Sequence, residues 1–304
     1  MTSLTVVILT FNEELHIQRC IESVKDIAQQ IVVVDSFSTD KTIDIVTSLG
    51  AEVVQHEFIN QAQQFQWALD TYPIESTWVL RLDADEYLEP ELVNEIKNRL
   101  SSLPNHVTGV ELRLREYYMG RWIRFGGRHS LCILRLFRRE KGVMVHSWMD
   151  ERIVVKDGQV IVFEHDFSNH NLHNTSWWIE KHNNYATREA VEILTKRYNL
   201  LFEENNTLSD SFFSKNRIKR FIKVWLYNKL PLFLGPLLYF FYRYFVRLGF
   251  LDGKEGAAYH FLQGFWYRFL VEVRVMELDR ELKGLPDKKT RIEKLEVMTG
   301  YFFE

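Results

Sequence analysis

Two carboxylates stand two positions apart in this chain, directly after an apolar run. Asp83 and Asp85 follow Trp78-Val79-Leu80, a run typical of a buried strand. Side chains at positions i and i+2 of an extended segment point to the same face. Paired carboxylate oxygens suit a hard divalent cation, Mg2+ or Mn2+, that also binds a diphosphate. We therefore expect a metal site at Asp83 and Asp85, and the alternative is a solvated acidic turn.

The segments that precede these carboxylates alternate between apolar β-branched runs and helical patterns. Residues 4–10, 31–34 and 52–54 predict strands, and residues 61–69 predict a helix. Alternation of this kind is typical of a parallel sheet with helices on both faces, whose ligands lie beyond the carboxyl ends of the strands. Because the first strand begins so close to Met1, we expect no signal peptide.

Polar side chains end three of the predicted strands, namely Thr10, Asp35 and Asp83. One shared ligand explains these three positions better than three separate turns, although Asp35 alone has the alternative role of capping a loop. The chain contains no Gly-x-Gly-x-x-Gly after its first strand and no P-loop motif, so the sequence signals neither a dinucleotide fold nor a P-loop. We therefore expect a metal ion to hold the phosphates of the ligand.

These segments resemble the inverting family 2 glycosyltransferases, which have the GT-A fold. Their order, spacing and strand context agree with that family over residues 4–165. The stretches that carry the resemblance are Thr10-Phe11-Asn12-Glu13-Glu14, Val33-Val34-Asp35-Ser36 with Ser38-Thr39-Asp40, and Leu82-Asp83-Ala84-Asp85-Glu86. The resemblance implies an α/β catalytic domain with a Rossmann-like mixed sheet and helices on both faces.

We expect this GT-A domain to occupy residues 1–210. Its nucleotide-sugar half is expected at about 1–100 and its acceptor half at about 101–210. The remainder, 211–304, is expected to be a basic, aromatic helical region that associates with a membrane. A chain of 304 residues is long enough for this division.

The resemblance also implies roles for individual residues. Asp83 and Asp85 would hold the metal ion and the diphosphate of a nucleotide sugar, with UDP-sugars favoured. Gln64 and Trp67 lie where the family often carries a Lys or Arg and a small residue, and they too are expected near the nucleotide. The other residues expected to contact the nucleotide are Thr10, Phe11, Asn12, Glu13, Asp35, Ser36 and Ala84.

An inverting transfer also needs a general base that deprotonates the attacking hydroxyl of the acceptor. The candidates are Asp150 and Glu151, which lie just before a predicted strand at 153–155. The family usually carries Glu-Asp in this part of the chain, whereas this chain carries Asp-Glu, so either residue remains the candidate base. The other member of the pair has an alternative role as an ion-pair partner of Arg152 or of another surface cation.

A histidine is the expected third metal ligand. His165 follows the predicted strand at 160–163, and GT-A enzymes often add a late histidine to the metal site, which is what the resemblance implies here. The alternative is a histidine that is hydrogen-bonded in a loop. His170 and His173 lie nearby without cysteine partners or a sustained helix, so a zinc site is not favoured. They are expected to be hydrogen-bonded in the loop or to contact the acceptor.

The C-terminal region has a different composition from the rest of the chain. Residues 211–270 contain ten basic and two acidic residues, although the whole chain has a formal net charge of −3. The longest uncharged apolar stretch, 230–242, is too short to span a bilayer. Aromatic and basic helices instead favour the interface of an anionic membrane, so we expect monotopic helices at 221–250 and 259–275. The alternative is a soluble helical subdomain that packs its aromatic residues internally or in a homo-oligomer.

The sequence thus predicts a metal-dependent inverting glycosyltransferase. The tail resembles bacterial enzymes that build lipopolysaccharide core or surface polysaccharide, through residues 178–186 and 247–253. This implies a lipid-linked saccharide acceptor at the cytoplasmic face of the bacterial inner membrane. Two cysteines do not make a disulfide framework, which agrees with a reducing compartment. The aromatic content of the basic region argues against nucleic acid as its partner. The rival functions are a nucleotidyltransferase on a similar sheet and a non-catalytic membrane adaptor.

Overall fold

The computed structural model describes residues 3–129, 131–145, 152–200 and 231–301. Within it the chain forms two compact units, Met1–Leu172 and His173–Glu304. The boundary between the two units therefore lies at Leu172, before the next helix begins. The boundary expected from the sequence, residue 210, lies outside the described residues.

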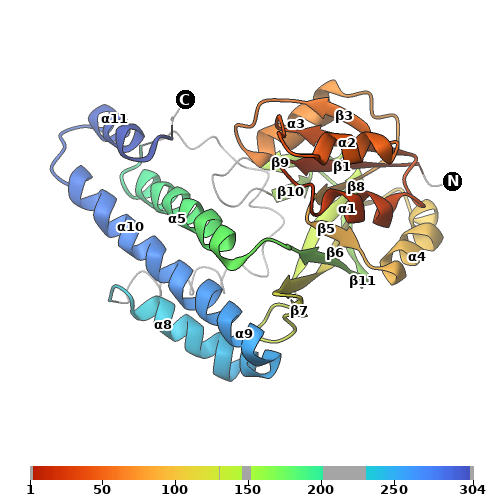
Figure 1. Ribbon diagram of the computed structural model, residues 1–304. Helices are drawn as coiled ribbons and strands as arrows, with labels where there is room; N and C mark the ends of the chain where they lie inside the picture. The colour runs from red at the N-terminus through yellow and green to blue at the C-terminus, as the bar shows by residue number, and fades with distance from the viewer. Residues whose placement is uncertain (1–2, 130, 146–151, 201–230, 302–304) are drawn as a thin grey trace. The chain divides into compact units, whose positions relative to one another are not determined.

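The first unit is built on a nine-stranded mixed sheet (Figure 1). Its first half is parallel, with strand order β3-β2-β1-β4. The bounds of these strands are Leu4–Thr10 for β1, Gln30–Asp35 for β2, Glu52–Gln55 for β3 and Trp78–Asp83 for β4. All four strands were predicted from their apolar runs. The register pairs Thr10 with Asp35 and Leu9 with Asp83, so the polar strand ends meet at one edge of the sheet, as expected.

Helices cover both faces of this parallel half. On β1, Val6 and Ile8 belong to one apolar cluster, whereas Val7 and Leu9 belong to the other. Because alternate side chains of a strand point to opposite faces, each face has a core of its own. Residues of α1 (Ile17–Val24) and α4 (Pro90–Arg99) complete the first cluster, residues of α3 (Gln61–Thr71) complete the second, and α2 (Thr42–Ser48) contributes Val46 to the first. The predicted α/β layering is confirmed.

The second half of the sheet is mixed. Strand β11 pairs with β6 in parallel and with β5 in antiparallel orientation, and β8 joins β6 to β4. This arrangement brings the carboxyl end of β11 beside the turn that follows β4. The bounds are Glu86–Leu88 for β5, Val107–Tyr118 for β6, Arg121–Trp122 for β7, Cys132–Arg138 for β8 and Gln159–His170 for β11, with a separate pair formed by β9 (Gly142–Val145) and β10 (Arg152–Val155).

The second unit is helical. Its core joins α5 (Thr175–Arg197) to α10 (Tyr267–Leu282) and α11 (Lys288–Thr299), as Figure 1 shows. Tyr267, Val271 and Val275 are buried in this core. The expectation of an interfacial helix at 259–275 is therefore corrected for the second half of this range, because the apolar side of that half packs within the protein. None of the described helices is long and apolar enough to cross a membrane.

The remaining helical segments within the described part of this unit form a hairpin. It consists of α8 (Leu234–Phe241), the π-helical η2 (Tyr242–Val246), the short 3-10 segment η3 (Gly249–Asp252), α9 (Gly253–Tyr259) and the π-helical η4 (His260–Trp266), which continues into α10.

Candidate active site at the strand ends

The end of β2 is organised around a buried aspartate. Asp35 is fully buried, and its carboxylate accepts hydrogen bonds from the Ser38 backbone N–H (2.9 Å), the Ser38 hydroxyl and Gln55 Nε2 (3.0 Å). Buried carboxylates need such donors, because an uncompensated charge is costly to bury. These bonds fix the loop after β2 in one conformation beside Thr10.

Thr10, at the end of β1, is 5% exposed. Its Oγ1 has no hydrogen-bond partner among the described residues. A buried hydroxyl without a partner costs roughly 1–3 kcal/mol. A polar group of a bound ligand would remove that cost, so this position fits a ligand contact of the kind expected from the sequence.

The loop after β1 is tied to the loop after β2. Asn12 Oδ1 accepts a hydrogen bond from the Thr39 N–H (2.8 Å), and the Asn12 N–H donates to the Ser38 hydroxyl (2.8 Å). The next residue, Glu13, donates its N–H to the Thr42 hydroxyl (2.8 Å). Asn12 has a φ of 54°, in the left-handed region that asparagine tolerates better than most residues. The expected nucleotide-binding segments thus form one connected surface.

Asn12→Ala is expected to lower the free energy of unfolding by about 2 kcal/mol. The substitution removes the side-chain hydrogen bond, and it places at positive φ an alanine, whose side chain cannot form the local hydrogen bonds that help asparagine adopt this conformation. Asn12→Gly removes only the side-chain bond and is the matched control, since glycine adopts this φ freely. Urea unfolding of both variants measures the difference. Equal loss in the two variants would show that backbone strain plays no part.

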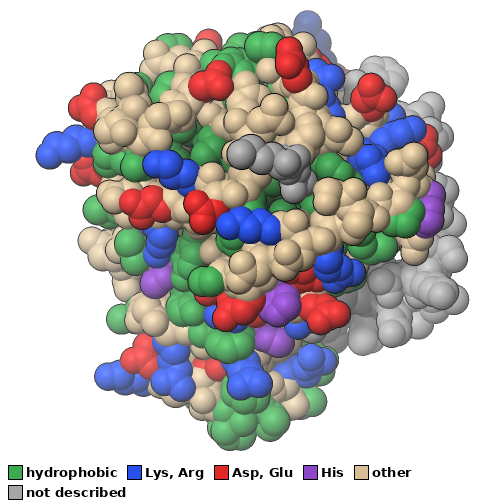
Figure 2. All heavy atoms as spheres, turned by 90° about the vertical axis from the view of Figure 1, so that its right-hand side faces the viewer, with side chains coloured by type: hydrophobic (Ala, Val, Ile, Leu, Met, Phe, Trp, Pro, Cys, Tyr) green, Lys and Arg blue, Asp and Glu red, His purple; other side chains and the backbone are tan. Residues whose placement is uncertain are grey.

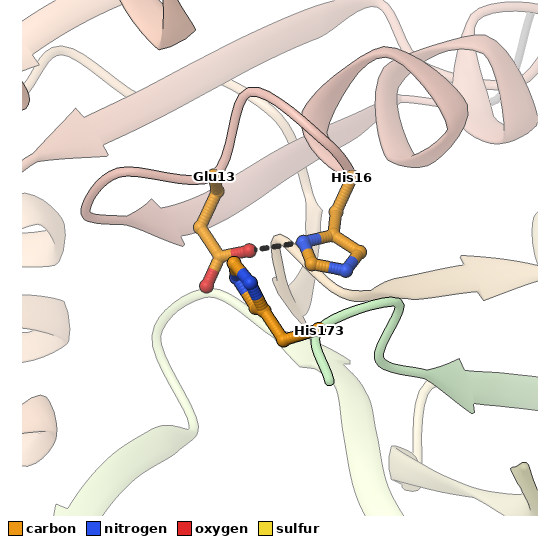
Figure 3. Close-up of side chains that lie close together, drawn as sticks. All are labelled: Glu13, His16 and His173. Atoms are coloured by element: carbon orange, nitrogen blue, oxygen red, sulfur yellow. Dashed lines mark hydrogen bonds and ion pairs between the residues drawn. The ribbon is translucent and has the colours of Figure 1, made fainter. Parts of the chain in front are cut away.

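A buried histidine connects this loop to the end of β11. His16 Nδ1 lies 2.5 Å from the Glu13 carboxylate (Figure 3). His16 Nε2 accepts the Leu172 N–H at 2.8 Å. Because Nε2 is an acceptor, the imidazole is neutral and carries its proton on Nδ1. The Glu13 carboxylate is therefore used to orient His16, and its expected contact with the nucleotide stays a prediction. Figure 3 also labels His173, the first residue of the second unit.

The Asp83-Ala84-Asp85 segment has a different conformation from the one expected. Strand β4 ends at Asp83, and Ala84 and Asp85 form a turn before β5. The two carboxylates are therefore not at positions i and i+2 of one extended strand, as expected from the sequence, because the backbone turns between them. Each aspartate has partners of its own.

Asp83 lies against two arginines. Its carboxylate is 3.2 Å from Arg81 and 3.3 Å from Arg135, and its N–H donates to Glu86 (2.9 Å). Glu86 is 2% exposed and forms an ion pair with Arg135. Burial raises the pKa of the Glu86 carboxyl, Arg135 opposes this rise, and the charge of Asp83 adds to it. The two arginines therefore compensate the negative charge of Asp83 within the protein.

Asp85 faces the carboxyl end of β11. Its carboxylate accepts a hydrogen bond from Asn171 Nδ2 (3.1 Å), and its carbonyl accepts the His170 N–H (3.1 Å). Arg19 holds the same end of β11 by donating to the His170 carbonyl at 2.7 Å. Unlike Asp83, Asp85 forms no ion pair with a cation within the described residues. Of the two carboxylates, Asp85 is therefore the more available to a divalent metal.

His165 is not brought to these carboxylates. Its Nδ1 lies 2.8 Å from Glu95 on α4, and Glu95 also accepts its backbone N–H (3.1 Å). His165 precedes His170, the β11 residue beside Asp85, by five positions on the same strand. Five strand residues span roughly 16 Å. The structure thus assigns His165 a partner on α4, and it brings His170 and Asn171 to Asp85 instead.

The other residues that were expected to contact the nucleotide differ in their exposure to solvent. Gln64 is buried, and its amide donates to the Ser36 hydroxyl (3.1 Å) and to the His56 carbonyl (3.1 Å). Trp67 stacks on the ring of His56. Gln64 therefore supports the loop after β2 from behind. Phe11 is exposed, whereas Ala84 is buried in the core.

The candidate bases, Asp150 and Glu151, lie outside the described residues. Their place in the site stays a prediction from the sequence. The strand expected to follow them is present as β10.

The arginines of this site were not predicted from the sequence, although a signal for them was present. Arg81 stands within the buried strand sequence Trp-Val-Leu-Arg-Leu-Asp, and Arg135 stands in the similar Cys-Ile-Leu-Arg-Leu-Phe. A charged residue inside an apolar run must find a buried partner. Strands β4 and β8 are neighbours, which places both arginines near Asp83.

Charges of both signs are interspersed on the face of the molecule that Figure 2 shows. Such mixing gives no extended field of one sign on this face, and an extended basic patch is what nucleic-acid binding requires.

Comparisons with known proteins agree with this geometry. Residues 5–166, more than half of the chain, match the model of a protein family described as "Glycosyl transferase family 2". The matched segment runs from β1 into β11 and includes Thr10, Asp35, Asp83 and Asp85, whereas His170 and Asn171 at the carboxyl end of β11 lie beyond it.

Curated relatives match over shorter stretches. An uncharacterized glycosyltransferase of Rickettsia bellii is 47% identical over 90 residues, which is 30% of this chain and 30% of that protein. The lipopolysaccharide core biosynthesis glycosyltransferase LpsC of Rhizobium meliloti is 31% identical over 162 residues, covering 52% of this chain and 58% of the relative. The chain thus spans about a third of the length of the first relatives and somewhat over half of LpsC.

Solved structures show weak likeness. Glucosyl-3-phosphoglycerate synthase from Mycobacterium tuberculosis, in complex with Mn2+, UDP and glucosyl-3-phosphoglycerate, aligns with a TM-score of 0.40 and 14% identity over 64% of this chain and 80% of that one. At this level the likeness carries no argument about residues or substrates.

Proposed function

The chain belongs to glycosyl transferase family 2, and from this premise we propose that it moves a sugar from a nucleotide-diphosphate donor to a saccharide acceptor with inversion at the anomeric carbon. A UDP-sugar is the favoured donor. The family membership and the strand-end chemistry both support an enzyme rather than a non-catalytic adaptor.

The meeting of three polar strand ends is the observation that carries this proposal. Thr10, with its unpartnered buried hydroxyl, pairs in register with Asp35, and Asp83 ends the strand on the other side of β1. In open α/β sheets, ligands bind beyond the carboxyl ends of the strands. The fixed loops after β1 and β2 suit the nucleoside, and the turn at Asp85 suits the diphosphate.

The residues of that turn fit a hard divalent cation, Mg2+ or Mn2+. Asp85 offers carboxylate oxygen, the donor type that these ions prefer. Asp83 is the second carboxylate, and Arg81 and Arg135 hold it in place. When bound, such a cation would stabilise the negative charge that develops on the departing diphosphate.

We propose that Asp150 or Glu151 is the general base. The base would take the proton of the acceptor hydroxyl as its oxygen bonds to the anomeric carbon and the nucleoside diphosphate leaves from the opposite face. This order conserves atoms and charge and yields one nucleoside diphosphate per sugar transferred.

The acceptor is proposed to be a lipid-linked saccharide of the bacterial cell envelope. LpsC carries lipopolysaccharide core biosynthesis in its name, which supports this class of acceptor. A lipid-linked acceptor would place the protein at the cytoplasmic face of the inner membrane.

Calorimetric titration with UDP-, GDP- and dTDP-sugars tests the donor site. We expect one nucleotide class to bind in the presence of Mn2+, and we expect removal of the ion with EDTA to weaken binding by at least about tenfold, because the ion is placed on the diphosphate. Release of a nucleoside diphosphate in the presence of an acceptor would support transfer. Release of pyrophosphate from a nucleoside triphosphate would instead favour a nucleotidyltransferase, and no binding or turnover would favour the adaptor.

A further inference from the structure

The hairpin of the second unit exposes an unusual amount of apolar surface. Of the 24 large hydrophobic side chains that are exposed in the described residues, twelve lie between positions 232 and 261. We call these twelve the apolar tip. Its members are Leu232, Leu234, Leu237, Leu238, Phe241, Tyr242, Phe245, Val246, Leu248, Phe250, Leu251 and Phe261.

The tip carries almost no charge. Residues 231–251 contain no acidic residue and two arginines. Arg243 is 3% exposed and lies over the rings of Tyr239 and Tyr259, so it adds no charge to the surface. Arg247 is exposed, and its guanidinium lies 3.5 Å from the Tyr242 hydroxyl. The exposed charge of this segment is therefore purely positive.

The turn beneath the tip is closely packed. A Cβ on Gly249 would lie 2.6 Å from the ring of His260, and a Cβ on Gly256 would lie 2.2 Å from Asp252. Asp252 and His260 are both buried and lie 3.4 Å apart. A side chain at either position would clash, and the approach of Gly249 to His260 shows that the turn between η2 and α9 packs closely on η4. The hairpin has its own small polar interior, and the apolar residues are left on the outside.

Helix α10, which continues from η4, differs from the tip because its apolar side chains are packed within the protein. Tyr267 and Arg268 both contact Glu189 of α5, and Val271 and Val275 are buried against the same helix. The neighbouring helix α10 thus packs against a partner helix, whereas these twelve side chains of the tip stay exposed among the described residues. Exposed apolar patches of this size mark interaction surfaces.

We propose that the apolar tip inserts into the interface of a bilayer that contains anionic lipids. Amphipathic helices with Phe and Leu on one face lie in the plane of the interface and do not span it. The helical run from Leu234 to Val246 is too short to span, and an exposed Arg247 suits anionic headgroups. The inference is independent of which sugar is transferred, because it rests on the second unit alone.

A second copy of the chain is a less suitable occupant than lipid. Stable protein interfaces carry a polar rim and about one hydrogen bond per 100–200 Å². Within 231–251 the exposed polar side chains are those of Tyr242 and Arg247 alone. A surface with so few hydrogen-bonding groups is matched by acyl chains, which require none.

Vesicle flotation of the full chain tests the proposal. Wild-type protein is expected to float with phosphatidylethanolamine–phosphatidylglycerol vesicles. Phe241→Ser combined with Phe245→Ser is expected to lower the partition coefficient by at least about tenfold, because two half-exposed rings lose their apolar burial. Val246→Ser, at the most exposed member of the tip, gives a second and structurally milder variant.

The matched control is Val297→Ser on α11, since Val297 is 84% exposed but lies outside the tip. This variant is expected to float like wild type. Arg247→Glu is expected to weaken binding to anionic vesicles by on the order of tenfold while leaving binding to phosphatidylcholine vesicles nearly unchanged. Far-UV circular dichroism and thermal melting confirm that each variant is folded.

Two results would overturn the proposal. The first is a wild-type protein that stays in solution with every vesicle, and the second is equal flotation by the wild type, the Phe241/Phe245 double variant and Val246→Ser. A homodimer that the double variant converts to monomer, without vesicle binding by either form, would assign the tip to a second copy.

Discussion

Asp85→Ala is expected to reduce sugar transfer by at least about a thousandfold and to leave the fold intact. Unlike the carboxylate of Asp83, that of Asp85 forms no ion pair with a cation in the described part of the chain, and its structural partner is the Asn171 amide. Loss of a metal ligand at the diphosphate would remove several kcal/mol of transition-state stabilisation, and about 4 kcal/mol corresponds to a thousandfold change in rate.

Asp85 is the better position for this test because Asp83 also forms ion pairs that stabilise the fold. Asp83 is paired with Arg81 and Arg135, so its removal would disturb buried charges as well as the proposed metal site. Asp85 accepts one side-chain hydrogen bond from a neutral amide. We therefore expect Asp85→Ala to lower the free energy of unfolding by only about 1 kcal/mol.

Turnover is measured as nucleoside diphosphate release with Mn2+, and stability is measured by urea unfolding of the same preparations. Asp26→Ala is the matched control, because Asp26 is an exposed aspartate that pairs with Lys97 away from the strand ends. Near wild-type turnover by Asp85→Ala would remove the metal from this turn. A large loss of turnover by the Asp26 variant would show that the assay reports a general effect of lost negative charge.

The parallel half of the sheet was predictable because its signals are local. Apolar β-branched runs of four to seven residues separated by helical patterns define β1 to β4, and the polar residue at each strand end is visible in the sequence. The position of Thr10 opposite Asp35 follows from parallel pairing alone. Local pattern and topology together therefore locate the candidate nucleotide site.

The acceptor half was harder to predict because its key contacts are made across long sequence separations. His165, His170 and Asn171 all lie within seven positions, and only the register of β11 against β5 decides which of them reaches Asp85. A one-residue change in register moves each side chain to the other face of the sheet. Sequence spacing carries no information on that register, which is why His165 was expected at the metal.

The same limit applies to the second unit. Composition indicated aromatic and basic helices but gave no means of deciding which apolar faces find partners within the protein. The structure pairs α10 with α5 and leaves most of the large apolar side chains of α8, η2 and η3 exposed. An amphipathic pattern specifies that a face is apolar, whereas the tertiary fold specifies what covers it.

Arg135→Met is expected to have the largest effect on stability among single substitutions at this site. Arg135 is 8% exposed and pairs with both Glu86 and Asp83. Removing one partner of a buried ion pair leaves an uncompensated charge and typically costs roughly 3–5 kcal/mol. Methionine retains much of the apolar length of the arginine side chain, so the change mainly removes the charge.

The destabilisation is expected to depend on pH. Arg135 opposes the rise in the pKa of Glu86 that burial causes, so without Arg135 the folded-state pKa rises further above its ordinary value of 4.5. A carboxyl whose pKa is raised by folding contributes its stability below the unfolded pKa and loses it as the pH rises through the folded pKa. Burial already raises the pKa of Glu86 to about 8 in the wild-type protein, so wild type and variant lose this stability in parallel below that pH. Urea unfolding should therefore show a defect that is nearly constant below about pH 8 and grows as the pH rises above it.

A second substitution separates lost charge compensation from lost packing. Combining Arg135→Met with Glu86→Gln replaces the buried pair by two neutral side chains of similar size. If the uncompensated Glu86 charge is the cause, the double variant should recover most of the lost stability and lose its pH dependence, because replacing both members of a buried pair is often nearly neutral. A double variant as unstable as Arg135→Met at every pH would show instead that the guanidinium acts through Asp83 or through its packing on Phe167.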